Sequence, residues 1–452
     1  MRKKVDLVFS GTADEIQRVK RSFVVRALKS ARNRKQNTTD IHEHGDDAHA
    51  THRYSTQTAS TILKLRSANA KIEAHFAISD VTAFEDGKQR QTGQFARLIL
   101  TTKSSSAFEL FKIARLLQEE SNYKLRLEAK SLSECTIDSI DPLFCTQKIL
   151  APANRIEINA NGTAHEARKA ALVYCAHRVA QLAPLISGNR NPQAVKQLRV
   201  ALRRFRTIER CFRMAGKDRE LSALANRARK FARILGHARD WAVFAEETLP
   251  GLALIYPRPE GIAALQTGAA RHRDLAWQNT VKTVNSPDFM RFCLDLYAAA
   301  WTPVARSKKG RRKSEMPARD FAEMILNHRR ARTLDLANGL DRKHPAAGHP
   351  LRLQLKKLRY SAQLFRDIYP KETRKPYFST LSALQDSFGA LNDAVIAETL
   401  ASHAAAGQGK AAIRAAGFVS GYVSTQANAH ARPIFENLAA FSKMPAYWRR
   451  KY

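Results

Sequence analysis

Two copies of one basic, amphipathic segment occur in this sequence, at 192–213 and at 349–366. In each copy the basic residues recur at steps of three and four, which places them on one face of an α-helix. A stripe of apolar residues follows the same rhythm beside them. Each segment therefore predicts a helix that has one buried face and, next to it, one strongly basic face.

The first basic stripe consists of Lys196, Arg199, Arg203, Arg206, Arg210 and Arg213. The second basic stripe consists of His349, Arg352, Lys356, Arg359 and Arg366. The apolar stripes contain Val195, Leu198, Leu202, Phe205 and Phe212 in the first copy, and Leu351, Leu355, Leu358 and Phe365 in the second. Like charges four residues apart destabilise a helix, so stripes this uniform favour a polyanionic ligand that relieves the repulsion. The alternative interpretation is a solvated basic face without a ligand.

A second pair of similar segments follows the basic ones, FARILGHARDWAVF at 231–244 and LQDSFGALNDAVIA at 384–397. The offset from Arg199 to Arg352 is 153 residues, and the same offset relates the glycines and the aspartates of this second pair. These equivalent residues are Gly236 with Gly389 and Asp240 with Asp393. Because the register is kept without a net insertion, the chain contains an internal duplication. A pseudo-symmetric fold built from it can place the two basic stripes opposite each other.

The chain has 452 residues and an excess of positive charge, with 76 Lys and Arg against 41 Asp and Glu, or +35. Such an excess predicts attraction to nucleic acid or another polyanion and says nothing about the fold. The hydrophobic content of 44% predicts real cores rather than a disordered basic tail. Five scattered cysteines without a CxxC motif, no signal-peptide pattern and no long apolar run predict a cytoplasmic protein without a membrane segment.

Residues 1–145 differ from the rest and predict a small α+β domain. Strands are expected at 5–9, 61–67, 71–78, 95–102 and 123–131, and helices at 13–31 and 107–121. A polar loop is expected between residues 37 and 58. It contains four histidines, His42, His44, His49 and His52. They lack the regular spacing of metal ligands, so a mobile loop is favoured over a metal site.

From about residue 160 the apolar period is helical throughout. Helices are expected at 162–186, 192–213, 218–235, 239–249, 260–284 and 287–301, and again at 318–340, 350–369, 375–390, 392–407 and 409–442. Residues 302–317 are expected to form a basic, solvated linker between the two sets. The sequence therefore predicts a mainly α protein with paired helical bundles.

The four motifs VKQLRVALRRFR, LGHARDWAVF, HPLRLQLKKLRY and LQDSFGALNDA together resemble the CHAD family, the conserved histidine α-helical domain. The resemblance covers 160–445, with units at about 160–301 and 318–445. It implies two four-helix bundles related by a pseudo-twofold axis. It also implies a basic groove or pore between them that binds inorganic polyphosphate without an enzymatic reaction, and association with polyphosphate granules.

The resemblance carries the family's basic positions onto both copies. They are Arg199, Arg203, Arg204 and Arg206 in the first copy and Arg352, Lys356, Lys357 and Arg359 in the second. The family histidine is present as His349, whereas its counterpart in the first copy is Lys196. Lysine keeps the positive charge but does not titrate near neutral pH as histidine does.

Residues 1–145 resemble, more distantly, the CYTH family of triphosphate tunnel proteins, which often precedes CHAD. The ExExK motif of that family aligns best with Lys4, Asp6 and Val8, so the pair of acids that would hold Mg²⁺ is incomplete. We therefore expect a degenerate domain without catalytic residues, metal or cofactor.

Three function classes remain open at this point. The first is a non-enzymatic polyphosphate-binding module. The second is a nucleic-acid-binding protein, supported by charge alone and expected to bind non-specifically. The third is a triphosphate hydrolase acting through residues 1–145. Asp240 and Asp393 could be metal ligands, but ion pairing or helix capping near the basic helices is favoured. The oligomeric state is left open.

Overall fold

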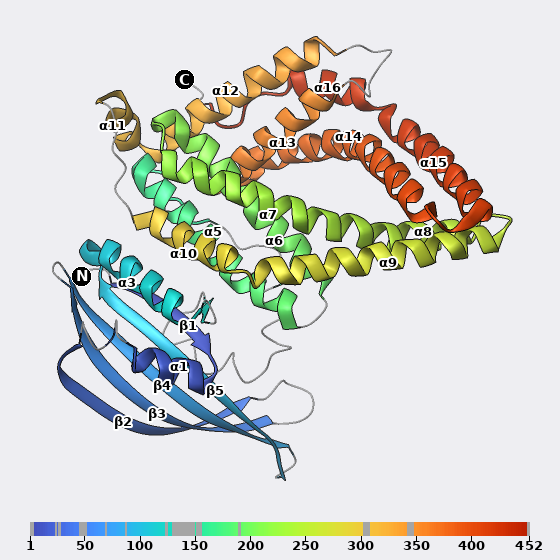
Figure 1. The fold of residues 1–452 in the computed structure, drawn as a ribbon. Helices are drawn as coiled ribbons and strands as arrows, with labels where there is room; N and C mark the ends of the chain where they lie inside the picture. The colour runs from blue at the N-terminus through green and yellow to red at the C-terminus, as the bar shows by residue number, and fades with distance from the viewer. Residues whose placement is uncertain are drawn as a thin grey trace. The chain divides into compact units, whose positions relative to one another are not determined.

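The computed structural model describes residues 4–22, 25, 29–44, 52–67, 70–85, 88–122, 125–128, 150, 156–188, 191–301, 308–340 and 348–449 (Figure 1). It contains two compact units. The first comprises Met1–Ala153, Leu172–Leu198 and Thr283–Val304, and the second comprises Asn154–Ala171, Arg199–Lys282 and Ala305–Tyr452. No helix in these described ranges has the length and apolar character needed to cross a bilayer.

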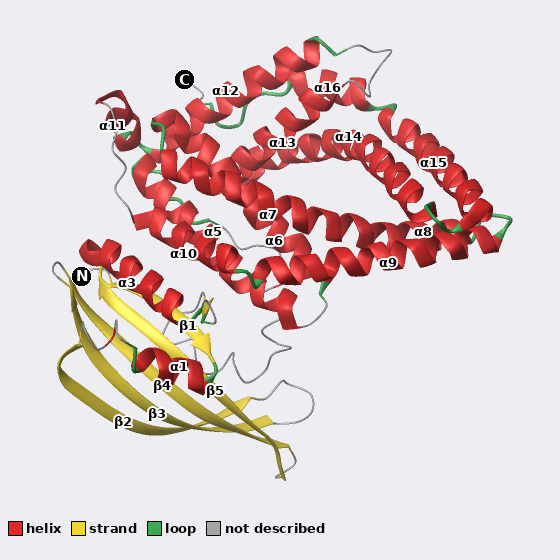
Figure 2. Cartoon of the chain, in the orientation of Figure 1, coloured by secondary structure: helices red, strands yellow, loops and turns green. Residues whose placement is uncertain are grey.

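The N-terminal part of the first unit is an antiparallel sheet with the strand order β2-β3-β4-β5-β1-β6. Its strands are β1 (Lys4–Gly11), β2 (Lys29–His44), β3 (His52–Ser67), β4 (Ala70–Glu85), β5 (Lys88–Lys103) and β6 (Arg126–Glu128). The helices α1 (Ala13–Lys20) and α3 (Ala107–Glu120) accompany it. Figure 2 shows the strands confined to this region. The predicted small α+β region is therefore present.

Strands β1 and β5 bury consecutive side chains, including Val8 and Ile99, so both faces of the sheet are covered there. Leu7 and Phe9 of β1 and Leu98 and Leu100 of β5 are almost fully buried. Helix α1 begins with a capping box, in which the Thr12 hydroxyl accepts from the Glu15 amide and the Glu15 carboxylate accepts from the Thr12 amide.

Two expectations for this region are wrong. The helix expected at 13–31 ends at Lys20, and β2 has begun by Lys29. The loop expected at 37–58 is largely strand, because β2 continues to His44 and β3 starts at His52, where the two residues are register partners. Pairing along a long neighbouring strand outweighs the weak intrinsic β-preference of these polar residues. His49 lies outside the described residues.

Among the described residues from Ala164 onward, helices predominate, as predicted. The helices of the first repeat are α5 (Ala164–Gly188), α6 (Pro192–Phe212), α7 (Arg219–Val243), α8 (Leu249–Ala253), α9 (Pro259–Val284) and α10 (Pro287–Trp301). Those of the second are α12 (Ala318–Asn338), α13 (His349–Leu364), α14 (Lys371–Ala405), α15 (Gly409–Ala431) and α16 (Ile434–Lys443). The short helix α11 (Lys308–Glu315) lies within the segment expected to be a solvated linker.

The helix breaks predicted near Gly236 and Gly389 are absent. Gly236 lies inside α7 and Gly389 lies inside α14, and neither residue ends its helix. A single glycine within a long helix costs only about 1 kcal/mol relative to alanine, which packing along these helices outweighs.

The duplication seen in the sequence is also present in the backbone. The 3₁₀ turns that follow α6 and α13, Arg213–Ala215 and Arg366–Ile368, are again 153 residues apart. The equivalent segments before α5 and α12 pair with each other. Ala164 N donates to Met316 O (2.9 Å), Ala318 N donates to Gly162 O (2.7 Å), and the bridge is antiparallel. An antiparallel pairing of equivalent segments is the contact that a local twofold axis produces. The arrangement as two four-helix bundles remains a prediction.

Within the second unit, the α7–α8–α9 hairpin and the α14–α15 hairpin meet in one apolar cluster (Figure 1). Leu249 and Leu265 contribute from one side, and Ala401 and Val419 from the other. A Cβ placed on Gly268 of α9 would lie only 2.1 Å from Ala404 O of α14, so glycine is required where these helices approach.

Candidate anion-binding site

The two apolar stripes are buried as predicted. In α6, Leu198, Leu202 and Phe205 have no exposed surface, and in α13 Leu355 and Leu358 are equally buried. Burial of these faces fixes the rotation of each helix, so the neighbouring basic stripe is fixed as well.

Helices α6 and α13 contact each other near their C-terminal ends. The rings of Phe212 and Phe365, which are equivalent in the two repeats, lie 6.4 Å apart in an edge-to-face arrangement. Cys211 Sγ and Ser361 Oγ lie 3.3 Å apart, and the Ser361 hydroxyl donates to Lys357 O. The two basic helices are therefore joined at these ends.

This packing brings the two basic stripes within electrostatic reach of each other. Burial, together with the charges of Arg352 and Arg203, lowers the pKa of Lys356 to about 8, and Asp393 opposes this shift. The pKa of Arg352 is lowered by burial, raised by Asp393 and lowered by Arg203. Arg203 and Lys356 are equivalent residues of the two repeats. Arg203 of the first stripe and Lys356 of the second therefore lie within electrostatic range of each other, and a common face formed by the two stripes remains a prediction.

Arg199 is held by the glycine-aspartate motif of α7. Its Nη1 lies 3.4 Å from Asp240 Oδ1, and its guanidinium lies over Gly236, where an added Cβ would be 3.4 Å from Nη2. The four-residue spacing of Gly236 and Asp240 places both on one helical face. The favoured interpretation of Asp240 as an ion-pair partner is confirmed.

The second repeat has a looser version of the same arrangement. Asp393 raises the pKa of Arg352, but its carboxylate is exposed and accepts a hydrogen bond from the Asn392 amide at 3.3 Å. A Cβ on Gly389 would meet nothing within 4 Å. The equivalent glycines therefore have different surroundings.

The central residues of the stripes are not a freely solvated face. Arg352 is 9% exposed, and Arg199, Arg203, Arg206, Arg210, Lys356 and Arg359 are half-buried. The Nε atoms of Arg199, Arg352 and Arg359 are buried and form no hydrogen bond with any described residue. Lys196 and His349, which are equivalent residues near the starts of α6 and α13, are exposed. Arg204 and Lys357 are half-buried.

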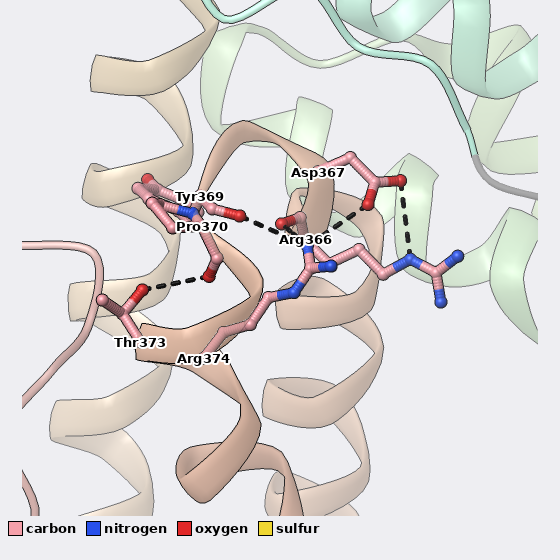
Figure 3. A network of polar contacts seen from close by, with 6 residues as sticks. All are labelled: Arg366, Asp367, Tyr369, Pro370, Thr373 and Arg374. Carbon is pink, nitrogen blue, oxygen red and sulfur yellow. Dashed lines mark hydrogen bonds and ion pairs between the residues drawn. The ribbon is translucent and has the colours of Figure 1, made fainter.

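The last residue of each stripe is compensated by an acid. Arg213 Nε donates to Glu209 Oε1 at 2.9 Å, and Arg366 Nε lies 3.5 Å from Asp367 Oδ2. Figure 3 shows Asp367 between Arg366 and Arg374, with Arg374 also bonded to the Arg366 and Tyr369 carbonyls. Both predicted site residues thus belong to ion pairs beyond the ends of the helices.

Four further arginines surround the stripes and were not singled out from the sequence. They are Arg229 and Arg239 of α7 and Arg329 and Arg332 of α12. Arg239 lowers the pKa of Arg199, and Arg229 lowers those of Arg206 and Arg210. Arg239 lies within the motif at 231–244, beside Asp240, whereas Arg229 lies outside the repeated motifs. Arg329 and Arg332 belong to the local run RRAR at 329–332.

Comparisons with known proteins agree with this architecture. The family model for the CHAD domain matches residues 163–402, which is more than half of the chain. The crystal structure of the CHAD domain from the plant Ricinus communis has 24% sequence identity and a TM-score of 0.54, covering 64% of this chain and 97% of that one. PptA from Streptomyces chartreusis has 16% identity and a TM-score of 0.49, covering 62% and 100%. A search of curated proteins gives no match. The chain belongs to the CHAD domain family.

Proposed function

We propose that this protein binds inorganic polyphosphate, without an enzymatic reaction, between the basic stripes of α6 and α13. The observation that carries the proposal is that Arg203 lies within electrostatic range of its equivalent Lys356 and of Arg352 and, together with their burial, lowers the pKa of both. Three positive groups are held together in partly buried positions, and the nearby Asp393 offsets only part of their charge. A polyanion between the helices would replace this repulsion with charge-assisted hydrogen bonds.

The proposed contacts come from both helices. They are Arg199, Arg203, Arg204, Arg206 and Arg210 of α6, and Arg352, Lys356, Lys357 and Arg359 of α13. Lys196 and His349 remain predicted contacts at the helix starts. Arg213 and Arg366 are omitted because they lie beyond the ends of α6 and α13, where each is paired with an acid.

The chemistry of the stripes suits a phosphate chain better than a nucleic acid. Polyphosphate offers only charge and acceptor oxygens, which arginine forks and lysine point charges match. A single-stranded nucleic acid would also be held by aromatic side chains that stack on its bases. Phe205 and Phe212, the aromatic residues of the first copy, are buried in the core, and the ring of Tyr360 lies beside the Arg359 guanidinium, 5.8 Å away. Binding of nucleic acid should therefore be weak and non-specific.

The absence of catalysis is part of the proposal. Asp240 is engaged by Arg199 and is therefore a poor candidate for a metal ligand. In the sheet, Val8 occupies one position of the degenerate CYTH-like motif and is buried beside its register partner Ile99. Lys4 stands in place of the first acid of this motif, so one of the two carboxylates that would hold Mg²⁺ against a triphosphate is missing. Localisation to polyphosphate granules would follow from the proposed binding.

Competition binding tests the proposal. A fluorescently labelled long-chain polyphosphate is bound to the protein, and unlabelled polyphosphate or DNA is added at equal phosphate concentration. We expect polyphosphate to displace the label and DNA to fail to do so. Arg199→Ala and Arg352→Ala should each weaken binding and flatten its dependence on salt, because fewer counterions are released. Arg271→Ala, an exposed arginine on α9, is the matched control. Unchanged affinity in both stripe variants would refute the site.

A further inference from the structure

We infer that α12 adds a second anion subsite to the one between the stripes, so that the protein selects long phosphate chains over short ones. This inference rests on the proposed function and extends it to the class of chain that is bound. The groups that form this α12 subsite are Arg329 and Arg332 of α12, Lys357 of α13 and Arg210 of α6.

Hydrogen bonds between the helices place these groups together. The Cys211–Ser361 contact joins α6 to α13, and the Ser361 hydroxyl donates to the carbonyl of Lys357. Arg210 precedes Cys211 in the chain, so it lies at the same level of the helix pair. Gln354 Nε2 of α13 lies 3.4 Å from Arg329 O, which joins α12 to the same pair.

The charges of the α12 subsite are not balanced by acids. Burial lowers the pKa of Lys357, and the charges of Arg210, Arg329 and Arg332 lower it further, with no acid opposing them. Glu209 raises the pKa of Arg210, but its carboxylate already accepts hydrogen bonds from Arg213 and from Ser222. The Arg329 Nε is buried and has no hydrogen-bond partner among the described residues. The subsite therefore has unused capacity for an anion.

The subsite belongs to one repeat only. Helices α5 and α12 are related by an offset of 154 residues, because α5 begins at Ala164 and α12 begins at Ala318. The residues equivalent to Arg329 and Arg332 are therefore Cys175 and Arg178, which are both buried in α5, whereas Arg332 is exposed. A chain held between the stripes thus meets a further set of cations on one side. This difference between the two repeats lies in α12 and not in the repeated motifs.

The distance along α6 sets how long a phosphate chain must be to reach both the stripe site and the α12 subsite. Arg199 and Arg210 are eleven residues apart, which corresponds to about 16 Å, or three helical turns. Each phosphate unit of a linear chain advances by less than one helical turn, so three phosphates cannot contact both ends of this path. Tripolyphosphate should occupy the stripe site alone, whereas a long chain should occupy both.

Calorimetric titration of the full chain with tripolyphosphate and with long-chain polyphosphate tests this inference. The variant is Arg329→Gln with Arg332→Gln, and the control is Arg271→Gln with Arg414→Gln, two exposed arginines on α9 and α15 that change the net charge equally. We expect the variant to lose at least about tenfold in affinity for the long chain, equivalent to about 1.4 kcal/mol. Its affinity for tripolyphosphate should stay within twofold of the control.

Two results would overturn the inference. Equal affinity of the variant and the control for the long chain would show that α12 does not contact it. Equal losses for both ligands would show that α12 is part of the stripe site and does not select length. If the double variant melts early, Arg332→Gln alone serves, because that side chain is exposed. Failure of the wild-type protein to bind either ligand would instead refute the proposed function.

Discussion

Replacing Lys356 by methionine should stabilise the free protein and weaken its binding of polyphosphate. Methionine has a similar length but no charge, so the substitution removes the repulsion with Arg352 and Arg203 and leaves the packing of the side-chain stem nearly unchanged. Binding sites that are optimised for a ligand commonly lose stability in its absence.

The expected gain in stability follows from the pKa of Lys356, which is about 8 in the folded protein against an ordinary value of 10.5. Between these values the unfolded chain binds more protons than the folded one, so the lysine's unfavourable contribution fades as pH rises. At pH 7 the shift corresponds to at most roughly 3 kcal/mol at 1.36 kcal/mol per pH unit. Because the side chain is partly exposed, screening by solvent reduces this figure to about 1–2 kcal/mol.

Thermal melting of the wild type and Lys356→Met from pH 7 to pH 10.5 measures this effect. A gain of about 1–2 kcal/mol should raise the melting temperature by roughly 2–6 °C at pH 7, and the difference should shrink above pH 8. Lys410→Met, at an exposed position on α15, should change little at any pH. A lower melting temperature for Lys356→Met at pH 7, or a gain that is independent of pH, would refute the reasoning.

Three further predictions concern the core, the C-terminal segment and the sheet. Leu202→Asp should unfold the helical region in circular dichroism, because it buries an unpaired carboxylate at a position with no exposed surface. A Trp448→Ala variant should lose about 3–5 kcal/mol in denaturant unfolding, because Trp448 is 2% exposed, donates to Asn327 Oδ1 at 2.9 Å and packs on Tyr377. A Leu202→Asp variant that stays folded, or a Trp448→Ala variant of unchanged stability, would contradict the packing described. The protein should release no phosphate from tripolyphosphate with Mg²⁺ or Mn²⁺ above background, and turnover that disappears on deletion of residues 1–145 would contradict the proposed lack of catalysis.

The parts of the site that could be predicted from the sequence are those set by local periodicity. The spacing of Leu202 and Phe205 determined which face of α6 is buried, and the offset of 153 residues identified α13 as its counterpart. Ion pairing of Asp240 near the basic helices was also predicted from the repeated motif, whereas Arg199 as its partner is known only from the structure.

The parts that could not be predicted depend on contacts between distant segments. Arg329 has no equivalent arginine in the first repeat, so its position beside Lys357 is set only by the packing of α12 on α13. The compensation of Arg366 by Asp367 depends on the 3₁₀ turn that follows α13. In the sheet, the polar composition of β2 does not indicate a strand. The strand is specified by its pairing with β3.

A structure of the protein crystallised with long-chain polyphosphate tests the central claim most directly. We predict phosphate groups within hydrogen-bonding distance of both Arg203 and Lys356, and further groups along the stripes of α6 and α13. Phosphate bound only at other surfaces, with Arg203 and Lys356 uncontacted, would contradict the account.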